Sequence, residues 1–281
     1  MMTIALTGSS GFVGSYLNKY FSSKNYKIIL IDRADFKDES LLRKKVLDSD
    51  IVINLVGANI MRRWTDAYKK EMYHSRIDNT KKIVQAINAN TKKQLLISTS
   101  AIGIYSDDIV NDENSYKYGD TFLTSICKDW EMEAKKANAR VVICRFGVVL
   151  GDGGALNKML LPFKLGLGGK IASGKQSFTF IHILDLARAQ EFLIKHKSLD
   201  GVFNFCAPYP ITNLIFTKVL AHTLKRPAFL PVPGMLLKLI FGDGSDILIG
   251  GQHVYPKRLL ENNFKFNFET IEGALKNLLT K

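Results

Sequence analysis

The chain has 281 residues, of which 46% are hydrophobic and 23% are charged, a composition that is ordinary for a globular protein and excludes a largely disordered one. Its formal net charge is +13, but the lysines are scattered singly and in pairs, without the dense basic tract or interleaved aromatic residues that nucleic-acid binding favours. No apolar run approaches the roughly 18 residues that a membrane-spanning helix needs. We therefore expect a small-molecule partner, an anionic one being the simplest match to the charge, and neither nucleic acid nor a membrane.

The chain opens with an apolar strand at residues 4–6, followed by a glycine-rich turn and a segment with helical periodicity. Gly8 permits a tight reversal, Gly11 lets the backbone approach a pyrophosphate, and Gly14 lets the new helix pack against the strand. The unpaired amides at the start of that helix, together with its dipole, favour phosphate groups. The turn therefore predicts a dinucleotide site that consists of Gly8, Ser9, Ser10, Gly11, Phe12, Val13 and Gly14.

The second strand, residues 28–31, ends in Asp32 at about the separation where a carboxylate reaches a ribose hydroxyl. Asp32 favours NAD, because it repels a 2′-phosphate, whereas the adjacent Arg33 can pair with that phosphate or stack on adenine. The cofactor is therefore predicted to be NAD or NADP, and the choice between them stays open.

Strands and helices alternate through the rest of the first half of the chain. Apolar runs predict strands at residues 50–55, 94–98 and 140–146, and helical periodicity predicts helices near residues 41–46, 64–90 and 122–137. The third strand runs into Leu55, Val56 and Gly57, where a small residue lets the cofactor pass close to the backbone. This alternation predicts an α/β fold of the Rossmann type, a doubly wound parallel sheet with helices on both faces.

The character of the chain changes after Leu150, where glycines and then prolines become frequent. A short aromatic strand at residues 177–181 leads to His182 and to a helix that begins near Asp185, and a further strand is expected at residues 201–206. We expect residues 1–150 to form the NAD(P)-binding Rossmann domain, and residues 151–281 to complete the core and form a smaller, mostly helical substrate lobe. The glycine run at residues 166–169 is expected to be a loop beside the cleft, since no clear helix start follows it.

The three cysteines, Cys127, Cys144 and Cys206, lie far apart and form no CxxC pair. This spacing favours buried, reduced thiols over disulfides or a metal site, and no metal is expected. Because no basic and apolar leader precedes the first strand, we expect a cytoplasmic protein.

The glycine turn, with a hydroxyl-rich strand and a following tyrosine, resembles the extended short-chain dehydrogenase/reductase superfamily. Further stretches look like the YfcH-type epimerase family, whose members are described as sugar-nucleotide epimerases that bind NAD(P). These stretches are Asn54-Leu55-Val56-Gly57, Arg62-Arg63-Trp64-Thr65, Ser75-Arg76, the segment from Gly147 to Gly151, the segment from Met159 to Phe163, Leu165-Gly166-Leu167-Gly168-Gly169, Ile181-His182-Ile183 and Pro256-Lys257-Arg258-Leu259. The resemblance covers essentially the whole chain. It implies an oxidoreductase or epimerase that acts on a nucleotide sugar or a related hydroxylated molecule.

The same resemblance exposes a departure at the expected catalytic residues. The superfamily uses a Tyr-x-x-x-Lys pair, in which the tyrosine exchanges a proton and the lysine lowers the pKa of the tyrosine and holds the ribose. With Glu131 aligned to the glutamate that is common four residues after the lysine, Leu123 stands at the tyrosine position and Cys127 at the lysine position. Neither residue can do that chemistry. Ser100 and Tyr105 are the remaining catalytic candidates, and a sensor that binds the dinucleotide without turnover is the alternative function.

Several further residues are candidates for ligand contact. Arg76 stands where the superfamily often has asparagine, and it is expected to meet the ribose or phosphate of the cofactor, with Glu71 as an acid that could fix its direction. Ser98 and Val149 complete the predicted cofactor site. The candidates for substrate contact are Lys158, Gln176, His182 and Arg258. The sequence leaves the oligomeric state open.

Overall fold

The structure is a computed structural model that describes residues 1–280. Its centre is a parallel sheet of six strands in the order β10-β6-β4-β3-β1-β2. These strands are β1 (Thr3–Thr7), β2 (Lys27–Ile31), β3 (Ile51–Asn54), β4 (Leu95–Ala101), β6 (Arg140–Phe146) and β10 (Gly201–Phe205). The strand order reverses between β1 and β3, which is the place where doubly wound sheets bind ligands. The predicted fold class is confirmed.

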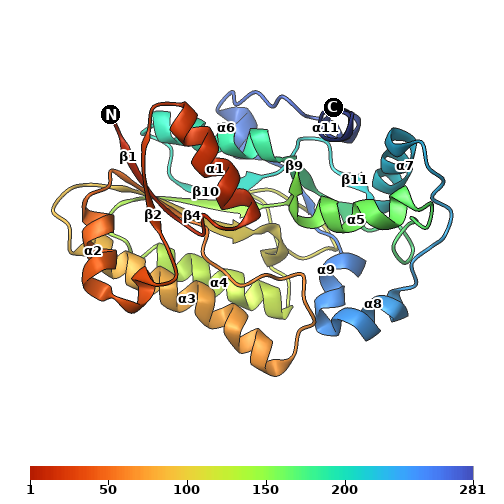
Figure 1. The fold of residues 1–281 in the computed structure, drawn as a ribbon, viewed down its shortest axis with the longest axis horizontal. Coiled ribbons are helices and arrows are strands. Elements are labelled where there is room, and N and C mark those ends of the chain that lie inside the picture. The colour runs from red at the N-terminus through yellow and green to blue at the C-terminus, as the bar shows by residue number, and fades with distance from the viewer. Residues whose placement is uncertain (281) are drawn as a thin grey trace.

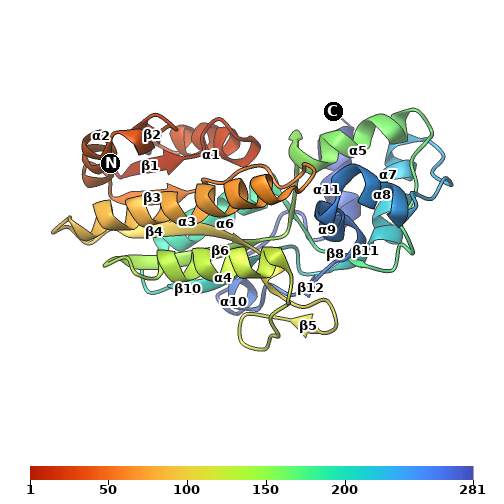
Figure 2. The same cartoon turned by 90° about the horizontal axis from the view of Figure 1, so that it is seen from below.

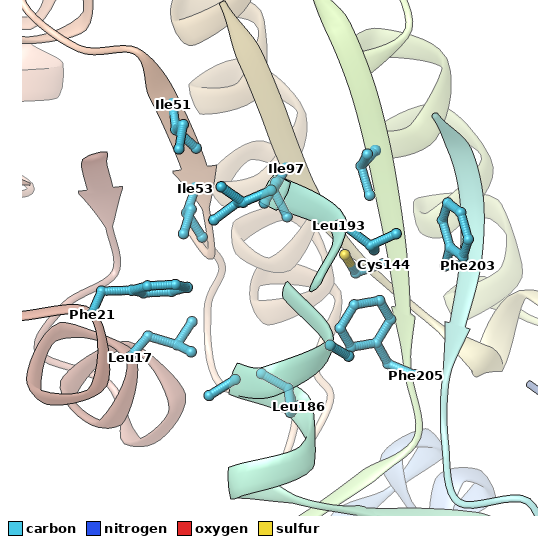
Figure 3. Close-up of a cluster of buried hydrophobic side chains, with 14 of the residues drawn as sticks. Leu17, Phe21, Ile51, Ile53, Ile97, Cys144, Leu186, Leu193, Phe203 and Phe205 are labelled. Atoms are coloured by element: carbon cyan, nitrogen blue, oxygen red, sulfur yellow. The ribbon is translucent and has the colours of Figure 1, made fainter. Parts of the chain in front are cut away.

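Helices cover both faces of the sheet (Figure 1). On one face lie α1 (Phe12–Ser23) and α6 (Ile183–Lys195), and on the other lie α2 (Glu39–Leu47), α3 (Asp66–Asn88) and α4 (Phe122–Ala134). Buried aliphatic side chains of α2 and α3 pack on one face of β1, β3 and β4. On the other face, Leu17 and Phe21 of α1 and Leu186 and Leu193 of α6 meet Ile53, Ile97 and Phe205 (Figure 3). Both faces of the sheet are therefore covered and buried from water, as expected of a parallel sheet.

The second half of the chain builds a lobe beyond the carboxyl ends of the strands (Figure 2). The lobe contains β7 (Val148–Gly151), α5 (Gly154–Lys164), β8 (Ser177–Phe178), β9 (Phe180–His182), β11 (Ile211–Thr212), α7 (Asn213–Leu224), α8 (Gly234–Phe241), α9 (Asp246–Ile249) and α11 (Ile271–Leu279). A separate apolar cluster holds it together, in which residues such as Phe163 of α5, Phe216 of α7 and Leu275 of α11 are buried.

Two short elements of the later chain return to the Rossmann half of the molecule. β12 (His253–Val254) pairs with β5 (Val110–Asn111), and α10 (Lys257–Glu261) packs on β10. Single turns of 3-10 helix lie at Asp35–Lys37, Ile102–Ile104 and Asp243–Ser245. No helix within residues 1–280 is both long and apolar enough to cross a membrane.

Local sequence explains where the helices begin. Thr65 accepts a hydrogen bond from the amide of Tyr68, which starts α3 two residues later than the predicted 64. His182 caps α6 in the same way through the amide of Leu184, so that helix begins at Ile183 rather than near Asp185. The predicted strand at residues 177–181 is two short strands, β8 and β9, which pair with different partners.

Candidate functional site

The glycine turn joins β1 to α1 at the carboxyl edge of the sheet. Gly8 has a φ of +67°, and the amide of Gly11 closes the turn on the oxygen of Gly8 at 3.0 Å. A Cβ on Gly14 would lie 2.1 Å from that oxygen, so no side chain fits there. A Cβ on Gly11 would touch only the Gly8 oxygen, at 3.3 Å, which leaves the space in front of α1 open. Neither a capping side chain nor an acidic residue occupies the first turn of α1, so its amides are available to an anion.

Asp32 lies next to this turn, because Thr7 pairs with Ile31 and the two strands end together. Asp32 and Arg33 are both exposed. The turn that carries them is fixed by buried Asp35, whose carboxylate accepts from the amide of Asp32 at 2.6 Å and pairs with Lys45 at 2.8 Å. A carboxylate and a guanidinium are thus presented beside the glycine turn with their side chains free to meet a ribose or its phosphate.

A cavity of about 740 Å³ continues from the helix start into the space between the sheet edge and the lobe. Of the residues predicted from the sequence, those that line it are Phe12, Val13, Leu55, Val56, Gly57, Arg76, Ser100, Val149 and Gln176. The ring of Phe12 lies against Gly151, Gly153 and Gly154, where any Cβ would come within 2.8 Å of it. This contact explains the glycine cluster after β7, because it lets the lobe close on the start of α1.

Arg76 is the buried cation of this cavity. Its guanidinium donates to the backbone oxygens of Met72 at 3.0 Å and Ala58 at 2.9 Å, and it lies 5.4 Å from the centroid of the Trp130 ring. A Cβ on Gly57 would come within 2.9 Å of the guanidinium carbon, so Gly57 makes room for it. Within residues 1–280 no carboxylate forms an ion pair with Arg76, and burial lowers the pKa of this side chain. A buried guanidinium without a carboxylate partner is suited to an anionic ligand.

Glu71 does not fix the direction of Arg76. Glu71 is exposed on α3, and the backbone carbonyls named above hold the guanidinium instead. The physical reason is the spacing, because five residues along a helix separate two side chains by about 140° around its axis.

Ser100 and Tyr105 belong to a buried polar network behind the cavity. Ser100 Oγ donates to Glu131 Oε1 at 2.7 Å, and the Glu131 carboxylate receives two bonds of 2.7 Å from Arg145. Arg145 Nη1 also donates to the hydroxyl of Tyr105 at 2.7 Å, and that hydroxyl donates to Asn204 at 2.8 Å. Burial raises the pKa of Tyr105 despite the nearby Arg145, which keeps the phenol protonated. Ser100 lines the cavity, whereas the fully buried Tyr105 does not.

Leu123 and Cys127 lie one turn apart on α4 and both line the cavity. Complete burial raises the pKa of the Cys127 thiol to about 11, so it is neutral at physiological pH. Leu123 packs under Gly103, where a Cβ would meet it at 2.4 Å. This part of the wall therefore carries no charge and no proton donor stronger than a thiol.

The other predicted residues lie outside the lining of the cavity. Lys158 is exposed and donates to the backbone oxygen of Met61, and Arg258 donates to the oxygen of Val202 while stacking on Phe203 at 4.1 Å. His182 caps α6 and stacks on Phe268 at 3.9 Å. Ser98 is buried within β4, and its hydroxyl has no hydrogen-bond partner within residues 1–280.

The glycine run at residues 166–169 starts no helix, and it packs against residues 227–231 of the lobe. Within the described part of the chain, no group of three or more histidine, cysteine, aspartate or glutamate side chains could hold a metal ion.

Sequence reasoning missed the network around Arg145 and the contacts that close the cavity. An arginine in the apolar run VVICRF was a usable signal, since Arg145 pairs in register with Ser100 on the neighbouring strand. The ion pair between Lys69 and Asp243 and the bridge between Trp64 and Gly242 join residues more than 170 positions apart. No pattern in the local sequence predicts contacts between residues that lie so far apart in the chain.

The comparisons with known proteins agree with this geometry. A profile described as the NAD dependent epimerase/dehydratase family matches residues 4–206. The chain belongs to that family. A second profile, a domain of unknown function, matches residues 232–278 of this epimerase-family chain.

Relatives of the same family match over nearly the full length. The chain is 36% identical to the Arabidopsis thaliana protein named "Epimerase family protein SDR39U1 homolog, chloroplastic", over 99% of this chain and 87% of that one. It is 35% identical to the mouse epimerase family protein SDR39U1, over 99% of this chain and 100% of the mouse protein. The crystal structure of human SDR39U1 with NADPH superposes with a TM-score of 0.92 at 32% identity, and it covers all of both chains. The chain is therefore an NAD(P)-binding epimerase-family protein, and the predicted cofactor class is confirmed.

Proposed function

We propose that this chain is an NAD(P)-dependent oxidoreductase or epimerase of the YfcH type. Its substrate is a small hydroxylated or carbonyl molecule held between the Rossmann sheet and the lobe. The observation that carries the proposal is the open α1 terminus, which leads into a cavity that contains buried Arg76, a guanidinium with no ion pair within residues 1–280. The human relative that was crystallised with NADPH supports the same assignment.

The residues present fit a dinucleotide. The α1 amides and the glycine turn would bind the diphosphate, Asp32 or Arg33 would meet the adenosine ribose or its phosphate, and Arg76 would neutralise an anionic group beside Gly57. Leu55, Val56 and Val149 would pack against the rings. When bound, the nicotinamide supplies or accepts a hydride.

The protein itself would position the substrate and handle its proton. Ser100 lines the cavity and donates to the buried carboxylate of Glu131, so Ser100 Oγ would accept the proton of a substrate hydroxyl as its own proton passes to Glu131 Oε1, and the reverse transfer would protonate a substrate carbonyl oxygen as it is reduced. Arg145 holds the Glu131 carboxylate in place through its two bonds. Tyr105 would position Arg145 from behind rather than touch the substrate.

The lining at Leu123 and Cys127 favours a second function, a sensor that binds the dinucleotide without turnover. Neither side chain supplies the proton donor or the fixed positive charge of the superfamily pair. Saturable NADPH binding without oxidation or reduction of any substrate in a broad panel would favour the sensor.

The dinucleotide site is tested with Gly11→Val. Gly11 has φ −79° and ψ 167°, which any residue adopts, so the variant should fold while its side chain fills the space in front of α1. We expect NADPH and NADH affinity, measured by fluorescence titration, to fall at least tenfold. The matched control, Gly273→Val, changes an exposed residue of α11, far along the chain from the glycine turn, and should leave affinity unchanged. Equal affinities in the two variants would refute the site.

A further inference from the structure

The charges around the cavity bear on the class of substrate that it can accept. Among the described residues, its lining contains two cations, Lys69 and Arg76, and three carboxylates, Asp120, Asp243 and Asp246. Lys69 forms an ion pair with Asp243, which raises the pKa of the lysine. Arg76 lies beside Gly57 at the dinucleotide end. Beyond that end, the described lining presents carboxylates and no unpaired cation.

Most of the remaining lining is apolar. Ile60, Trp64 and Leu123 face the cavity from the Rossmann domain, and Met159, Phe178 and Leu248 face it from the lobe. A nucleoside diphosphate needs cations or backbone amides for its phosphates. Placed here, its phosphates would meet hydrocarbon, neutral polar side chains such as Asn59, Asn213 and Gln252, and carboxylates, but no unpaired cation to balance their charge, so the electrostatic free energy of binding would be unfavourable.

A few polar atoms are left to orient a bound molecule. Gln176 donates its amide to the backbone oxygens of Ile171 and Leu248, and its buried Oε1 has no partner within residues 1–280. The buried hydroxyl of Thr99, also in the lining, has none either. Gln176 can therefore accept from a hydroxyl of a ligand, and Thr99 can donate to a carbonyl.

We propose that the substrate is an uncharged molecule with an apolar body and one or two hydroxyl or carbonyl groups, and not a nucleoside diphosphate sugar. A medium-chain ketone or the corresponding secondary alcohol is the simplest molecule of this class. The inference rests on the proposed function, since the same cavity is assumed to hold the dinucleotide at its other end.

The chain carries its own probe of cavity occupancy. Trp64 and Trp130 are its two tryptophans, and both line the cavity. Tryptophan fluorescence is titrated with 2-hexanone, 2-octanone, 2-decanone, UDP-glucose and UDP, with and without NADPH. We expect saturable quenching by the ketones with an affinity that rises about fourfold per methylene, as apolar burial requires, and, with NADPH bound at the dinucleotide end, no saturable response to UDP-glucose or UDP. A flat ketone series, or tighter binding of UDP-glucose than of 2-decanone in the presence of NADPH, overturns the proposal.

A matched pair of variants locates the binding. Leu248→Asp places a charge in the lining and should weaken 2-decanone binding at least tenfold, and Met159→Asp should do the same. Leu239 lies on α8 of the same lobe, is 71% exposed and does not line the cavity. The variant Leu239→Asp therefore makes the same chemical change outside the cavity and should leave binding unchanged. Equal weakening by Leu239→Asp, or none by both lining variants, overturns the proposal.

NADPH binding is measured in the same samples through the emission of the cofactor. If the ketones bind and NADPH does not, the proposed function fails and the substrate class stands. If NADPH binds and the ketones do not, the substrate class fails and the proposed function stands.

Discussion

Arg76 is held in the interior by two carbonyl oxygens and one aromatic ring, and within residues 1–280 by no carboxylate. A cation in such a place costs desolvation free energy in the folded protein, and a bound anion recovers it. The residue therefore contributes to ligand binding more than to stability. Arg145 and Arg188, by contrast, form ion pairs with buried carboxylates, so their charges are balanced within the folded protein.

The variant Arg76→Gln tests this role. We expect its NADPH affinity to fall at least tenfold, because the buried charge is lost, and its free energy of unfolding to stay within about 1 kcal/mol of the parent, because the desolvation cost is lost too. Fluorescence titration and urea unfolding measure the two quantities separately.

Arg188→Gln is the control with the opposite expectation. Arg188 pairs at 2.6 Å with Asp185, a carboxylate that is 1% exposed, and neither residue lines the cavity. Removing this arginine should lower stability and leave NADPH affinity unchanged. If Arg76→Gln behaves as Arg188→Gln does, Arg76 is structural.

At the scale of single elements, the stability of the α3 helix depends on Thr65, the residue just before it. The Thr65 side chain accepts from the amide of Tyr68, and α3 then carries Lys69 and Arg76 into the cavity. Thr65→Ala should lower the free energy of unfolding by about 1 kcal/mol, because an amide at the helix start loses its acceptor. Thr65→Ser keeps the hydroxyl and should restore most of it in urea unfolding. A serine variant as unstable as the alanine variant would show that the cap bond is not the cause.

The elements also show how far sequence patterns reach. The run Arg140–Phe146 is a strand with the predicted bounds, and the glycine turn lies where its spacing placed it, because both depend on local periodicity and backbone sterics. The division of the predicted strand at residues 177–181 was not foreseeable, since its halves pair with strands far away in the chain. The same holds for the site. The glycine turn could be predicted from residues 8–14 alone, whereas the network around Arg145 depends on the register between β4 and β6, which no local pattern specifies.

At the scale of the whole molecule, all three cysteine thiols are buried in the interior. Cys127, Cys144 and Cys206 are free and buried, and burial raises the pKa of each thiol, for Cys127 to about 11. The thiols of the native state therefore stay protonated at pH values above 9, at which the thiols of an unfolded chain, with pKa values near 9, lose their protons. Stability should be insensitive to these groups below pH 9 and should fall as the pH rises from 9 toward 11.

Urea unfolding at pH 8 and pH 10.5 measures this loss of stability, and thiol titration checks the burial from which it follows. In a colorimetric thiol assay at pH 8, the native protein should show almost no reactive thiol, and guanidinium chloride should expose all three. Rapid reaction of one thiol in the native state would mean that its site opens more readily than the packing indicates.

The chain passes between the sheet and the lobe several times. After β6 it enters the lobe, returns for α6 and β10, enters again through α7 and α8, returns for β12 and α10, and ends in α11, which packs on α7. The lobe thus consists of three separate segments of the chain, so exchanging it with that of a relative would require five crossovers rather than one. A crossover between α7 and α11 would separate two helices that pack together, so changes in specificity within such an architecture are expected to accumulate by point substitution.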